Sequence, residues 1–284
     1  MPPKPLLAPP PEAVTKAVND ALAEDLGRGD ITSMAVIPED ARFKGTLRAR
    51  EAMTVAGLAC AEAAFLALDP MAKWTAHAAD GDTVTADSEI AHIEGNARAL
   101  LTAERTALNL MQHLSGIATL TRAYADAIAG TGARLKDTRK TVPGLRALAK
   151  YAARAGGAVN HRMRLDDGVL IKDNHIAVAG GVAAAVAAAR AQHLSPIEVE
   201  CDTIDQVREA IDASADEVLL DNMNTGTLRE AVAMAKGHAR TEASGGVTLG
   251  TVRALAETGV DFISVGRITQ SAPAVDIGLD WVVD

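Results

Sequence analysis

The residues of this chain that could do chemistry are concentrated in one basic segment. Between Arg134 and Lys172 the sequence holds ten Lys or Arg and three Asp, a local charge of +7, although the whole chain carries −9. Two carboxylates, Glu200 and Asp221, follow in the short apolar runs IEVEC and EVLLD. Cations beside paired carboxylates suit a polyanionic ligand that also offers sugar hydroxyls, or Mg2+ held through such a ligand.

The elements that must position these residues alternate in type after residue 130. Six short apolar runs are expected as strands, at 133–137, 169–172, 197–201, 217–221, 239–244 and 262–266. Helical patterns lie between most of them, at 177–192, 204–213, 224–236 and 248–257. This rhythm predicts parallel βαβ units. Because a complete barrel has eight strands, six strands favour an open, incomplete α/β barrel, with a doubly wound sheet as the alternative.

Ligands of parallel α/β folds bind at the carboxyl ends of the strands. The residues expected there are Asp137, Thr138, Arg139, Lys140, Lys172, Glu200, Asp221, Ser244, Gly245, Gly246, Gly266 and Arg267. His161 and Arg162 are expected to lie at the same end of the barrel, where the strands have their carboxyl ends. Only Glu200 and Asp221 are expected to face these cations, so the empty pocket should carry excess positive charge. A structural ion pair between Glu200 and Lys172 is the alternative role for that carboxylate.

A second signal is the stretch EASGGV, in which Ser244, Gly245 and Gly246 stand between a strand and a helix. Glycines let backbone amides approach a phosphate, and a helix N-terminus adds partial positive charge. The SVGR stretch with Val265–Arg267 ends the next strand. Barrels often bind phosphate between their last two strand loops, so the two stretches together predict a phosphate site.

The first part of the chain has a different pattern. A helix is expected at 12–26 and a strand buried on one face at 43–50, whereas 96–130 reads as helix broken near Ser115-Gly116. These features predict an N-terminal α/β sandwich with a helical bridge over residues 1–116. The open barrel should span 117–284, with 275–284 as a candidate return to the first domain.

Composition excludes several classes of function. The chain has only seven aromatic residues and a net charge of −9, which argues against nucleic-acid binding. Its longest uncharged apolar run, 176–189, is too short to span a bilayer, and residues 1–11 lack the features of a secretory signal, so a cytoplasmic protein is expected. Cys60 and Cys201 lack CxxC spacing and are expected as buried free thiols. No His/Cys cluster with zinc spacing is apparent.

A series of motifs, in order along nearly the whole chain, resembles the quinolinate phosphoribosyltransferase family, also called carboxylating nicotinate-nucleotide pyrophosphorylases. The matching stretches are EDLGRGDIT, ERTALN, KDTRKTVPGLRALAKYA, GGAVNHRMRLDDGVLIKDNH, IEVECDT, VLLDNM, EASGGV and DFISVGRIT. Val142 replaces a Thr that the family pattern would have, and this neutral exchange leaves the neighbouring cations in place.

The resemblance implies an N-terminal α/β sandwich, a C-terminal open α/β barrel and a homodimer that shares residues between its sites. It also implies the reaction of quinolinate with phosphoribosyl pyrophosphate in the presence of Mg2+, giving nicotinate mononucleotide, pyrophosphate and CO2 in NAD biosynthesis. Two substrate carboxylates and several phosphate charges account for a basic segment on an acidic scaffold.

Residue roles carried over from the resemblance are expectations. Arg139, His161, Arg162 and Lys172, together with Thr138, are expected to bind quinolinate, and Arg105 is expected to come from the partner subunit. Lys140 should reach the pyrophosphate and the reacting centre. Glu200 and Asp221 should hold the ribose hydroxyls near Mg2+. Ser244, Gly245, Gly246, Val265, Gly266 and Arg267 should cradle the 5′-phosphate.

Two alternatives remain at this stage. One is a relative of the same fold that acts on another anionic heterocycle, such as the type found beside molybdate transport genes. The other is a non-catalytic barrel that senses phosphorylated metabolites, in which Lys140, Glu200 and Asp221 would have no required chemistry.

Overall fold

The structure is a computed structural model that describes residues 6–281, so residues 1–5 of the Pro-rich start and 282–284 lie outside the description. The chain forms two compact units. Within the described residues, the first unit holds the chain up to Arg122, Thr141–Gly157 and the chain from Arg267 onward. The second unit holds Ala123–Lys140 and Ala158–Gly266.

The first unit is built on a four-stranded antiparallel sheet in the order β12-β1-β5-β3. The strands are β1 (Arg42–Ala49), β3 (Lys73–Ala76), β5 (Glu89–Asn96) and β12 (Ile277–Trp281), while β2 (Met53–Thr54) pairs separately with β4 (Thr83–Val84). β1 buries Phe43, Leu47 and Ala49 at alternate positions, which confirms the strand expected there and follows from the two-residue period of a strand. β12 runs antiparallel to β1 from the far end of the chain.

Among the residues that the structure describes, six helices accompany this sheet: α1 (Pro11–Leu26), α2 (Ile31–Val36), α3 (Leu58–Leu68), α4 (Ala97–Ala127), α5 (Arg146–Ala155) and α11 (Arg267–Gln270). The helix expected at 12–26 is confirmed as α1, which ends at Gly27 with a φ of 51°. Asp30 caps the start of α2, because its side chain accepts hydrogen bonds from the backbone N–H groups of Thr32 and Ser33.

The break expected near Ser115-Gly116 is wrong, because α4 runs without interruption for 31 residues. Ser115 is buried, and its hydroxyl donates to the Ala56 carbonyl and accepts from the Ala56 N–H. A Cβ on Gly116 would lie 2.1 Å from the Pro273 carbonyl oxygen. The two small residues therefore permit close packing of backbone against the helix rather than interrupting it.

The second unit is a six-stranded, all-parallel sheet in the order β6-β11-β10-β9-β8-β7. Its strands are β6 (Arg134–Lys136), β7 (Val169–Ile171), β8 (Ile197–Cys201), β9 (Glu217–Asp221), β10 (Arg240–Ser244) and β11 (Phe262–Ser264). β6 and β7 form the two edges, and the sheet stays open between them. The open α/β barrel with six strands is confirmed.

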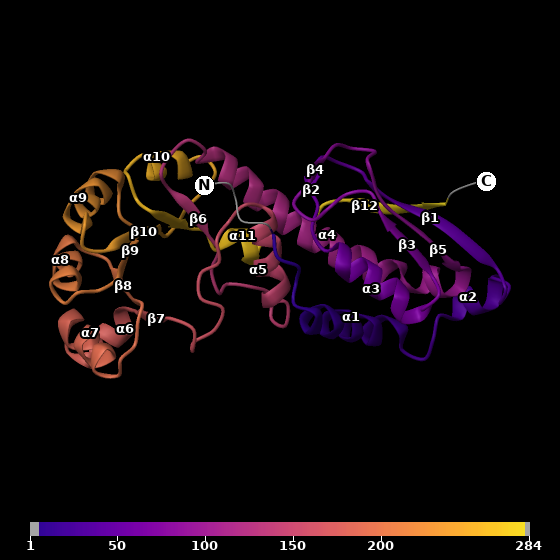
Figure 1. Cartoon of the computed structure of the whole chain (residues 1–284), viewed down its shortest axis with the longest axis horizontal. Helices are drawn as coiled ribbons and strands as arrows, with labels where there is room; N and C mark the ends of the chain where they lie inside the picture. The colour runs from indigo at the N-terminus through magenta and orange to yellow at the C-terminus, as the bar shows by residue number, and fades with distance from the viewer. Residues whose placement is uncertain (1–5, 282–284) are drawn as a thin grey trace. The chain divides into compact units, whose positions relative to one another are not determined.

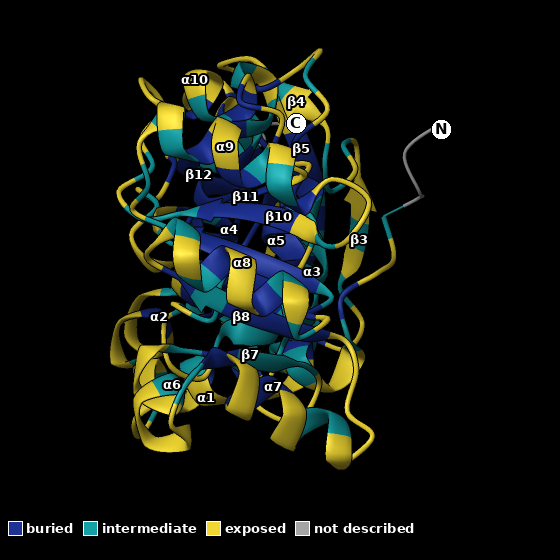
Figure 2. Ribbon diagram, turned by 90° about the vertical axis from the view of Figure 1, so that its left-hand side faces the viewer, coloured by how far each residue is buried: buried dark blue, intermediate teal, exposed yellow. Residues whose placement is uncertain are grey.

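Five helices cover the outside of this sheet: α6 (Asp173–Ala179), α7 (Val182–Ala191), α8 (Ile204–Asp212), α9 (Thr225–Ala235) and α10 (Val252–Ala256). Figure 2 shows α7, α8 and α9 with exposed outer faces and buried strands behind them, and Figure 1 shows the same layering from the side. The single helix expected at 177–192 is wrong, since Gly180 and Gly181 have φ values of 87° and 134° and divide it into α6 and α7.

Both cysteines are buried free thiols, as expected. Burial raises the pKa of the Cys60 thiol to about 12 and that of Cys201 to about 12, so neither is a reactive thiolate. In the part of the chain that the structure describes, no helix has both the length and the apolar character needed to cross a bilayer.

Candidate active site at the strand ends

The carboxyl ends of three neighbouring strands bring polar side chains to one edge of the parallel sheet. β8, β9 and β10 lie side by side, and they carry Glu200, Asp221 and Ser244 at or next to their last positions. Asp221 and Ser244 are direct partners in the parallel register. All three residues are half-buried, so they line the edge without being sealed from solvent.

Lys172 reaches this edge from the end of β7, where it precedes α6. Its ammonium forms an ion pair with Oε2 of Glu200, so the structural ion pair left open by the sequence is present. The Lys172 side chain is 44% exposed and that of Glu200 is 15% exposed. Because partly exposed pairs are held weakly, an incoming carboxylate can replace Glu200 as the partner of Lys172.

Asn222 positions Asp221, and sequence reasoning did not identify it. Its φ is 53°, a left-handed conformation that Asn tolerates better than most residues. Its side-chain amide donates to Oδ2 of Asp221 at 2.5 Å, and its backbone N–H donates to the Ser244 carbonyl at 2.9 Å. The signal available in the sequence was an Asn directly after the strand-ending Asp in VLLDNM.

The glycine turn after β10 has the backbone shape that a phosphate cradle requires. Gly245 and Gly246 have φ values of 92° and 59°. A Cβ on Gly245 would lie 2.1 Å from Oδ1 of Asn222, so only glycine fits beside that amide. The turn is followed by α10, but this helix begins only at Val252, later than the expected 248.

The loop after β11 meets the loop after β6, since these strands are neighbours. A Cβ on Gly266 would lie 2.9 Å from Cδ of Lys140, so the lysine side chain passes directly over the glycine. Val265 is buried, and its N–H donates to the Lys136 carbonyl, which fixes the start of this loop. Arg267 is exposed and begins α11.

Four of the expected cations, Arg139, Lys140, His161 and Arg162, lie on the segments between β6 and β7. Asp137 is fully buried and accepts hydrogen bonds from the His161 N–H at 2.8 Å and the Asn160 amide at 2.5 Å, which ties residues 160 and 161 to the end of that strand. Thr138 accepts from the Lys140 N–H at 3.0 Å. The Arg162 guanidinium donates to the Gly168 carbonyl at 2.9 Å.

Arg139 and Arg162 form a pair of guanidinium groups with unused donors. The Nε atoms of both are buried and have no hydrogen-bond partner among the described residues. Burial, and then the charge of Arg139, lower the pKa of Arg162. Two neighbouring cations with buried, unsatisfied donors are stabilised by an anion that accepts from both.

The expectation that only Glu200 and Asp221 face the cations is wrong. Lys136 forms ion pairs with Glu217 and with Glu242, the latter at 2.5 Å, and His161 Nε2 lies 2.9 Å from Oε2 of Glu198. These three glutamates are buried inside the barrel. Strand alternation explains the miss, because Glu198 and Glu200 share the inward face of β8, whereas only strand ends were considered.

The buried glutamates have unusual acidity. Burial raises the pKa of Glu198, and burial together with the charge of Glu198 raises that of Glu242. Burial lowers the pKa of Lys136, but the surrounding glutamates more than reverse this and leave it raised. The barrel interior therefore holds a charged cluster of Lys136, Glu198, Glu217 and Glu242, called the interior cluster below.

A cavity of about 430 Å³ opens onto this interior cluster rather than onto the strand ends. Arg134, Arg240 and Phe262, which begin β6, β10 and β11, line it together with His161 and Arg162. The guanidinium carbons of Arg134 and Arg240 lie 6.0 and 5.7 Å from the centre of the Phe262 ring. Since Glu200 and Asp221 are absent from its lining, the cavity does not contain the strand-end carboxylates.

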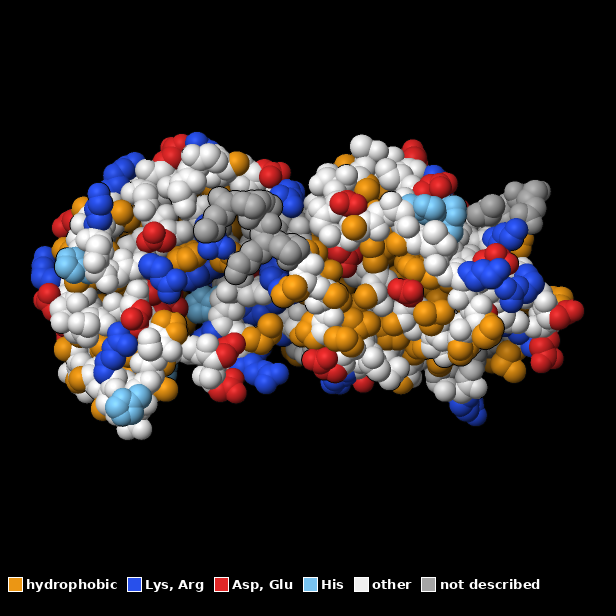
Figure 3. Space-filling view, in the orientation of Figure 1, with side chains coloured by type: hydrophobic (Ala, Val, Ile, Leu, Met, Phe, Trp, Pro, Cys, Tyr) orange, Lys and Arg blue, Asp and Glu red, His pale blue; other side chains and the backbone are white. Residues whose placement is uncertain are grey.

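Arg105 belongs to the first unit. It lies on α4 with its side chain 57% exposed, and its guanidinium is 4.0 Å from the neighbouring Glu104 carboxylate. In the space-filling view, Lys and Arg side chains lie among Asp and Glu over the barrel unit, whereas hydrophobic side chains gather around α1 and α3 of the first unit (Figure 3).

An open parallel barrel whose strand ends carry cations, two carboxylates and a glycine turn defines an α/β-barrel protein equipped to bind a phosphorylated, polyanionic ligand. Comparisons with known proteins make this specific. Residues 117–280 match the family described as quinolinate phosphoribosyl transferase, C-terminal domain, and residues 30–115 match its N-terminal domain. The chain belongs to the quinolinate phosphoribosyltransferase family.

Individual relatives align with this chain over almost its full length. The probable carboxylating nicotinate-nucleotide pyrophosphorylase of Synechocystis is 46% identical over 268 residues, covering 92% of this chain and 90% of the relative. The Bacillus subtilis relative of the same name is 43% identical, covering 93% and 92%. The nicotinate-nucleotide pyrophosphorylase structure from Francisella tularensis superposes with a TM-score of 0.94 at 40% identity, covering 99% and 100%. Some plant relatives carry chloroplastic or mitochondrial names.

Proposed function

We propose that this chain is a carboxylating nicotinate-nucleotide pyrophosphorylase, a pentosyltransferase of NAD biosynthesis. It transfers the phosphoribosyl group of phosphoribosyl pyrophosphate to quinolinate, with loss of CO2 and release of nicotinate mononucleotide and pyrophosphate. The family and its curated relatives support the reaction. The observation that carries the substrate choice is the Arg139 and Arg162 pair with buried, unsatisfied Nε atoms, which suits a ligand with two carboxylates.

In this proposal, quinolinate lies against the cations that follow β6 and β7. Arg139 and Arg162, together with His161 and Lys172, donate hydrogen bonds to its carboxylates, and Thr138 orients the loop. Lys172 breaks its ion pair with Glu200 and forms one with a substrate carboxylate. His161 either gives up its contact with Oε2 of Glu198 or keeps it while it also binds the substrate. Each charge-assisted hydrogen bond of this kind contributes about 1.5–3 kcal/mol net.

The phosphoribosyl group lies over the carboxyl ends of β8 to β11. Glu200 and Asp221 hold the ribose hydroxyls, and the turn Ser244–Gly246 with residues Val265–Arg267 accepts the 5′-phosphate. The positive φ values of Gly245 and Gly246 support this placement, since such backbone forms a concave array of N–H groups. In this proposal Lys140, whose side chain crosses Gly266, contacts the pyrophosphate.

Mg2+ is part of the proposal. Carboxylate oxygens of Glu200 and Asp221 are suitable donors for Mg2+, directly or through water, and this ion usually keeps most of its coordination to phosphate and water. When bound, it would neutralise charge on the departing diphosphate. The other contributions come from the chain itself.

The mechanism follows from charge. As the bond between C1 of the ribose and the pyrophosphate oxygen breaks, Lys140 stabilises the leaving group while Glu200 and Asp221 favour positive charge on the sugar ring. The pyridine nitrogen forms the new bond to C1. The adjacent carboxylate then departs as CO2, and the electron pair of the broken C–C bond stays on that ring carbon as a carbanion, which the neighbouring quaternary nitrogen and Lys172 stabilise until a proton adds to the carbon.

The experiment that tests this function is a product analysis. Purified protein is incubated with phosphoribosyl pyrophosphate, Mg2+ and either quinolinate or nicotinate, and CO2 and nicotinate mononucleotide are followed by mass spectrometry. We expect product from quinolinate only. Turnover of nicotinate, or of another heterocycle with no turnover of quinolinate, would keep the phosphate site and refute the proposed substrate.

We further propose a homodimer in which Arg105 of one subunit completes the site of the other. The exposed guanidinium of Arg105 and the apolar surface around α1 and α3 support an association with a second copy. Mixing Arg105→Ala with Arg139→Ala subunits should restore activity, because one site of each hybrid would be intact. Confirmed hybrids without recovered activity would refute the shared site. A cytoplasmic location stays a prediction, since some plant relatives are named as organellar.

A further inference from the structure

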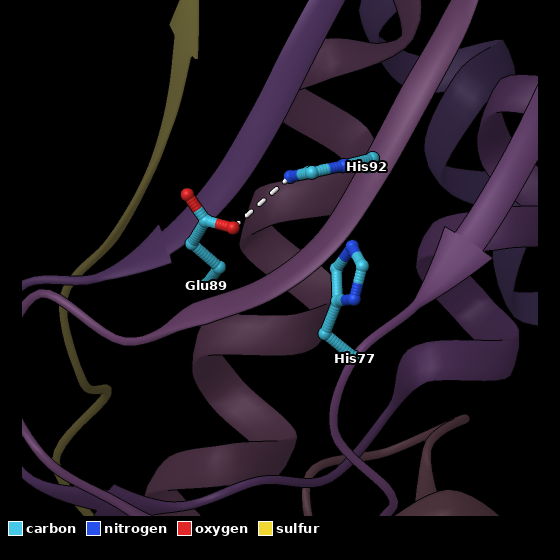
Figure 4. Close-up of side chains that lie close together, drawn as sticks. All are labelled: His77, Glu89 and His92. Carbon is cyan, nitrogen blue, oxygen red and sulfur yellow. Dashed lines mark hydrogen bonds and ion pairs between the residues drawn. The ribbon is translucent and has the colours of Figure 1, made fainter.

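Three side chains of the first unit form a cluster that the proposed reaction does not use. His77 follows β3, and Glu89 and His92 lie on β5 (Figure 4). Their ligand atoms, one from each residue, all lie within 4.8 Å of one another. Nε2 of His92 is 3.2 Å from Oε2 of Glu89, and the imidazole rings of His77 and His92 meet edge to face with centroids 4.3 Å apart.

An irregularity in β5 puts these side chains on one face. Glu89 and His92 are three residues apart, so strict alternation would send them to opposite faces of the sheet. The register between β1 and β5 shifts between Leu47 and Arg48, and Ile90 and Ala91 are buried in succession. This bulge turns Glu89 back to the exposed face, where His92 also lies.

The same irregularity places His77. The backbone N–H groups of His77 and Ala78 both donate to the Ile90 carbonyl, at 2.9 and 3.2 Å. The chain leaving β3 is thus held against the bulge, and its imidazole is presented to the two ligand atoms on β5. The bulge in β5 and the hydrogen bonds from His77 and Ala78 to the Ile90 carbonyl therefore bring the three residues together, rather than chance proximity of flexible loops.

Arg48 orients the carboxylate. Its guanidinium lies 2.7 Å from Oε1 of Glu89 and also donates to the Asp87 carbonyl at 2.7 Å. Arg48 occupies Oε1, and Oε2 stays directed at His92. A carboxylate fixed by an outer hydrogen bond is the usual arrangement in protein metal sites.

We propose that His77, Glu89 and His92 form a site for one divalent transition-metal ion of the Zn2+ class, with water in the remaining positions. Two imidazoles and a carboxylate suit this class of ion and are a poor match for Mg2+, which prefers oxygen donors. Donor atoms around a tetrahedral Zn2+ lie about 3.3 Å apart when bond lengths are about 2.0–2.1 Å. His92 and Glu89 already match this spacing, and His77 is exposed and free to rotate inward.

The site would connect the turn after β3, an edge strand, to β5 beside it. Bound metal should therefore stabilise the edge of the first unit's sheet without entering the reaction. This role is independent of the proposed function, because none of the three residues belongs to the barrel strand ends.

The test uses the full chain freed of metal by a chelator. Zn2+ is titrated by calorimetry, and Co2+ is titrated by visible absorption, which reports the ligand set. We expect one equivalent to bind per chain, and we expect His77→Gln, Glu89→Gln and His92→Gln each to weaken it at least about tenfold. His238→Gln, which removes an exposed imidazole from the barrel unit, is the matched control and should bind as the parent does.

Melting curves distinguish a variant that has lost metal binding from one that has lost stability. Without metal, the three variants should melt as the parent chain does, because their side chains lie at the surface. With Zn2+, the melting temperature should rise for the parent and for His238→Gln only. Absence of Zn2+ and Co2+ binding by the parent chain, or equal binding by all variants, would overturn the proposal.

Discussion

The strand ends and the interior cluster of the barrel use the same residue types on the same strands, yet their surroundings differ. β8 carries Glu198 inside and Glu200 at the edge, and β10 carries Glu242 inside and Ser244 at the edge. Glu242 is fully buried, whereas Glu200 has a side chain that is 15% exposed. On β10, two positions along the strand thus separate the buried charge of Glu242 from the half-buried Ser244 at the edge.

This difference predicts which property each region controls. Lys136 forms buried ion pairs with two glutamates of the interior cluster, so removal of these charges should change stability. The Lys172–Glu200 ion pair at the strand ends is partly exposed, so removal of a charge there should change binding and turnover. The predictions below test this division, from the largest expected effect to the smallest.

Lys136→Met should cause the greatest change in stability. The substitution keeps an unbranched side chain that is one heavy atom shorter, but it leaves Glu217 and Glu242 without their shared cation. At about pH 8, the free energy of unfolding should fall by about 3–5 kcal/mol, as expected when one partner of a buried ion pair is removed. Urea unfolding followed by circular dichroism measures it.

The control for this variant is Lys16→Met, which removes an exposed pair with Asp20 on α1. Its effect should stay below about 0.5 kcal/mol. A comparably small effect for Lys136→Met would mean that the interior glutamates are protonated without the lysine, and the interior cluster would then contribute little.

Asp221→Asn and Glu217→Gln compare the two ends of β9. Asp221 ends the strand beside Ser244, whereas Glu217 begins it and pairs with Lys136. Asp221→Asn should lower kcat about 10²–10³-fold, because a charge aimed at the transition state is lost. Glu217→Gln should lower stability and leave kcat within about threefold of the parent. Equal losses of kcat in steady-state assays would show that the two regions are not separable.

Gly245→Ala should weaken binding of phosphoribosyl pyrophosphate. The new Cβ would meet Oδ1 of Asn222, and the φ of 92° is unfavourable for alanine, so the turn must shift. A cost of about 1–2 kcal/mol corresponds to a loss of affinity of roughly five- to thirtyfold, measurable by calorimetry.

Gly237→Ala is the matched control for this turn. Its φ of 82° imposes similar backbone strain, but nothing lies within 4 Å of the added Cβ and the residue is remote from the strand ends. It should lower stability slightly and leave affinity unchanged. If both variants lost affinity equally, general strain rather than the shape of the phosphate cradle would be responsible.

Much of the architecture could be predicted from the sequence because parallel βαβ units have a strong period. All six barrel strands were expected within two residues of their ends, and the strand-end residues followed from that assignment. The errors involve glycine. Gly180 and Gly181 divide a helix that the apolar pattern joined, whereas Gly116 sits inside a helix that the pattern divided, because glycine can serve either a turn or a close contact.

Contacts between distant residues were not predictable in the same way. Asn222 and Gly245 are complementary only after β9 and β10 pair. His77 meets Glu89 and His92 only because β5 has a bulge, and the spacing of these three residues does not resemble a zinc motif. The interior cluster had a visible signal, since alternate acidic residues in IEVEC share a face, but attention to strand ends alone missed it.

The last effect expected is a change in the slope of stability against pH rather than a single loss, and it depends on the raised pKa values of Glu198 and Glu242. Burial raises each pKa from about 4.5 to about 7 in the folded chain. The folded state therefore binds more protons than the unfolded state between these values, so this contribution to stability is present below about pH 4.5 and is lost as pH rises through about 7. Glu242→Gln removes one of the two groups and should make the decline shallower, by up to about 1.4 kcal/mol per pH unit for a full proton. Urea unfolding of the parent and variant across this range measures the difference in slope. Parallel curves would show that Lys136 keeps Glu242 ionised in the folded state, in which case the interior cluster is a fixed ion network rather than a proton-sharing one.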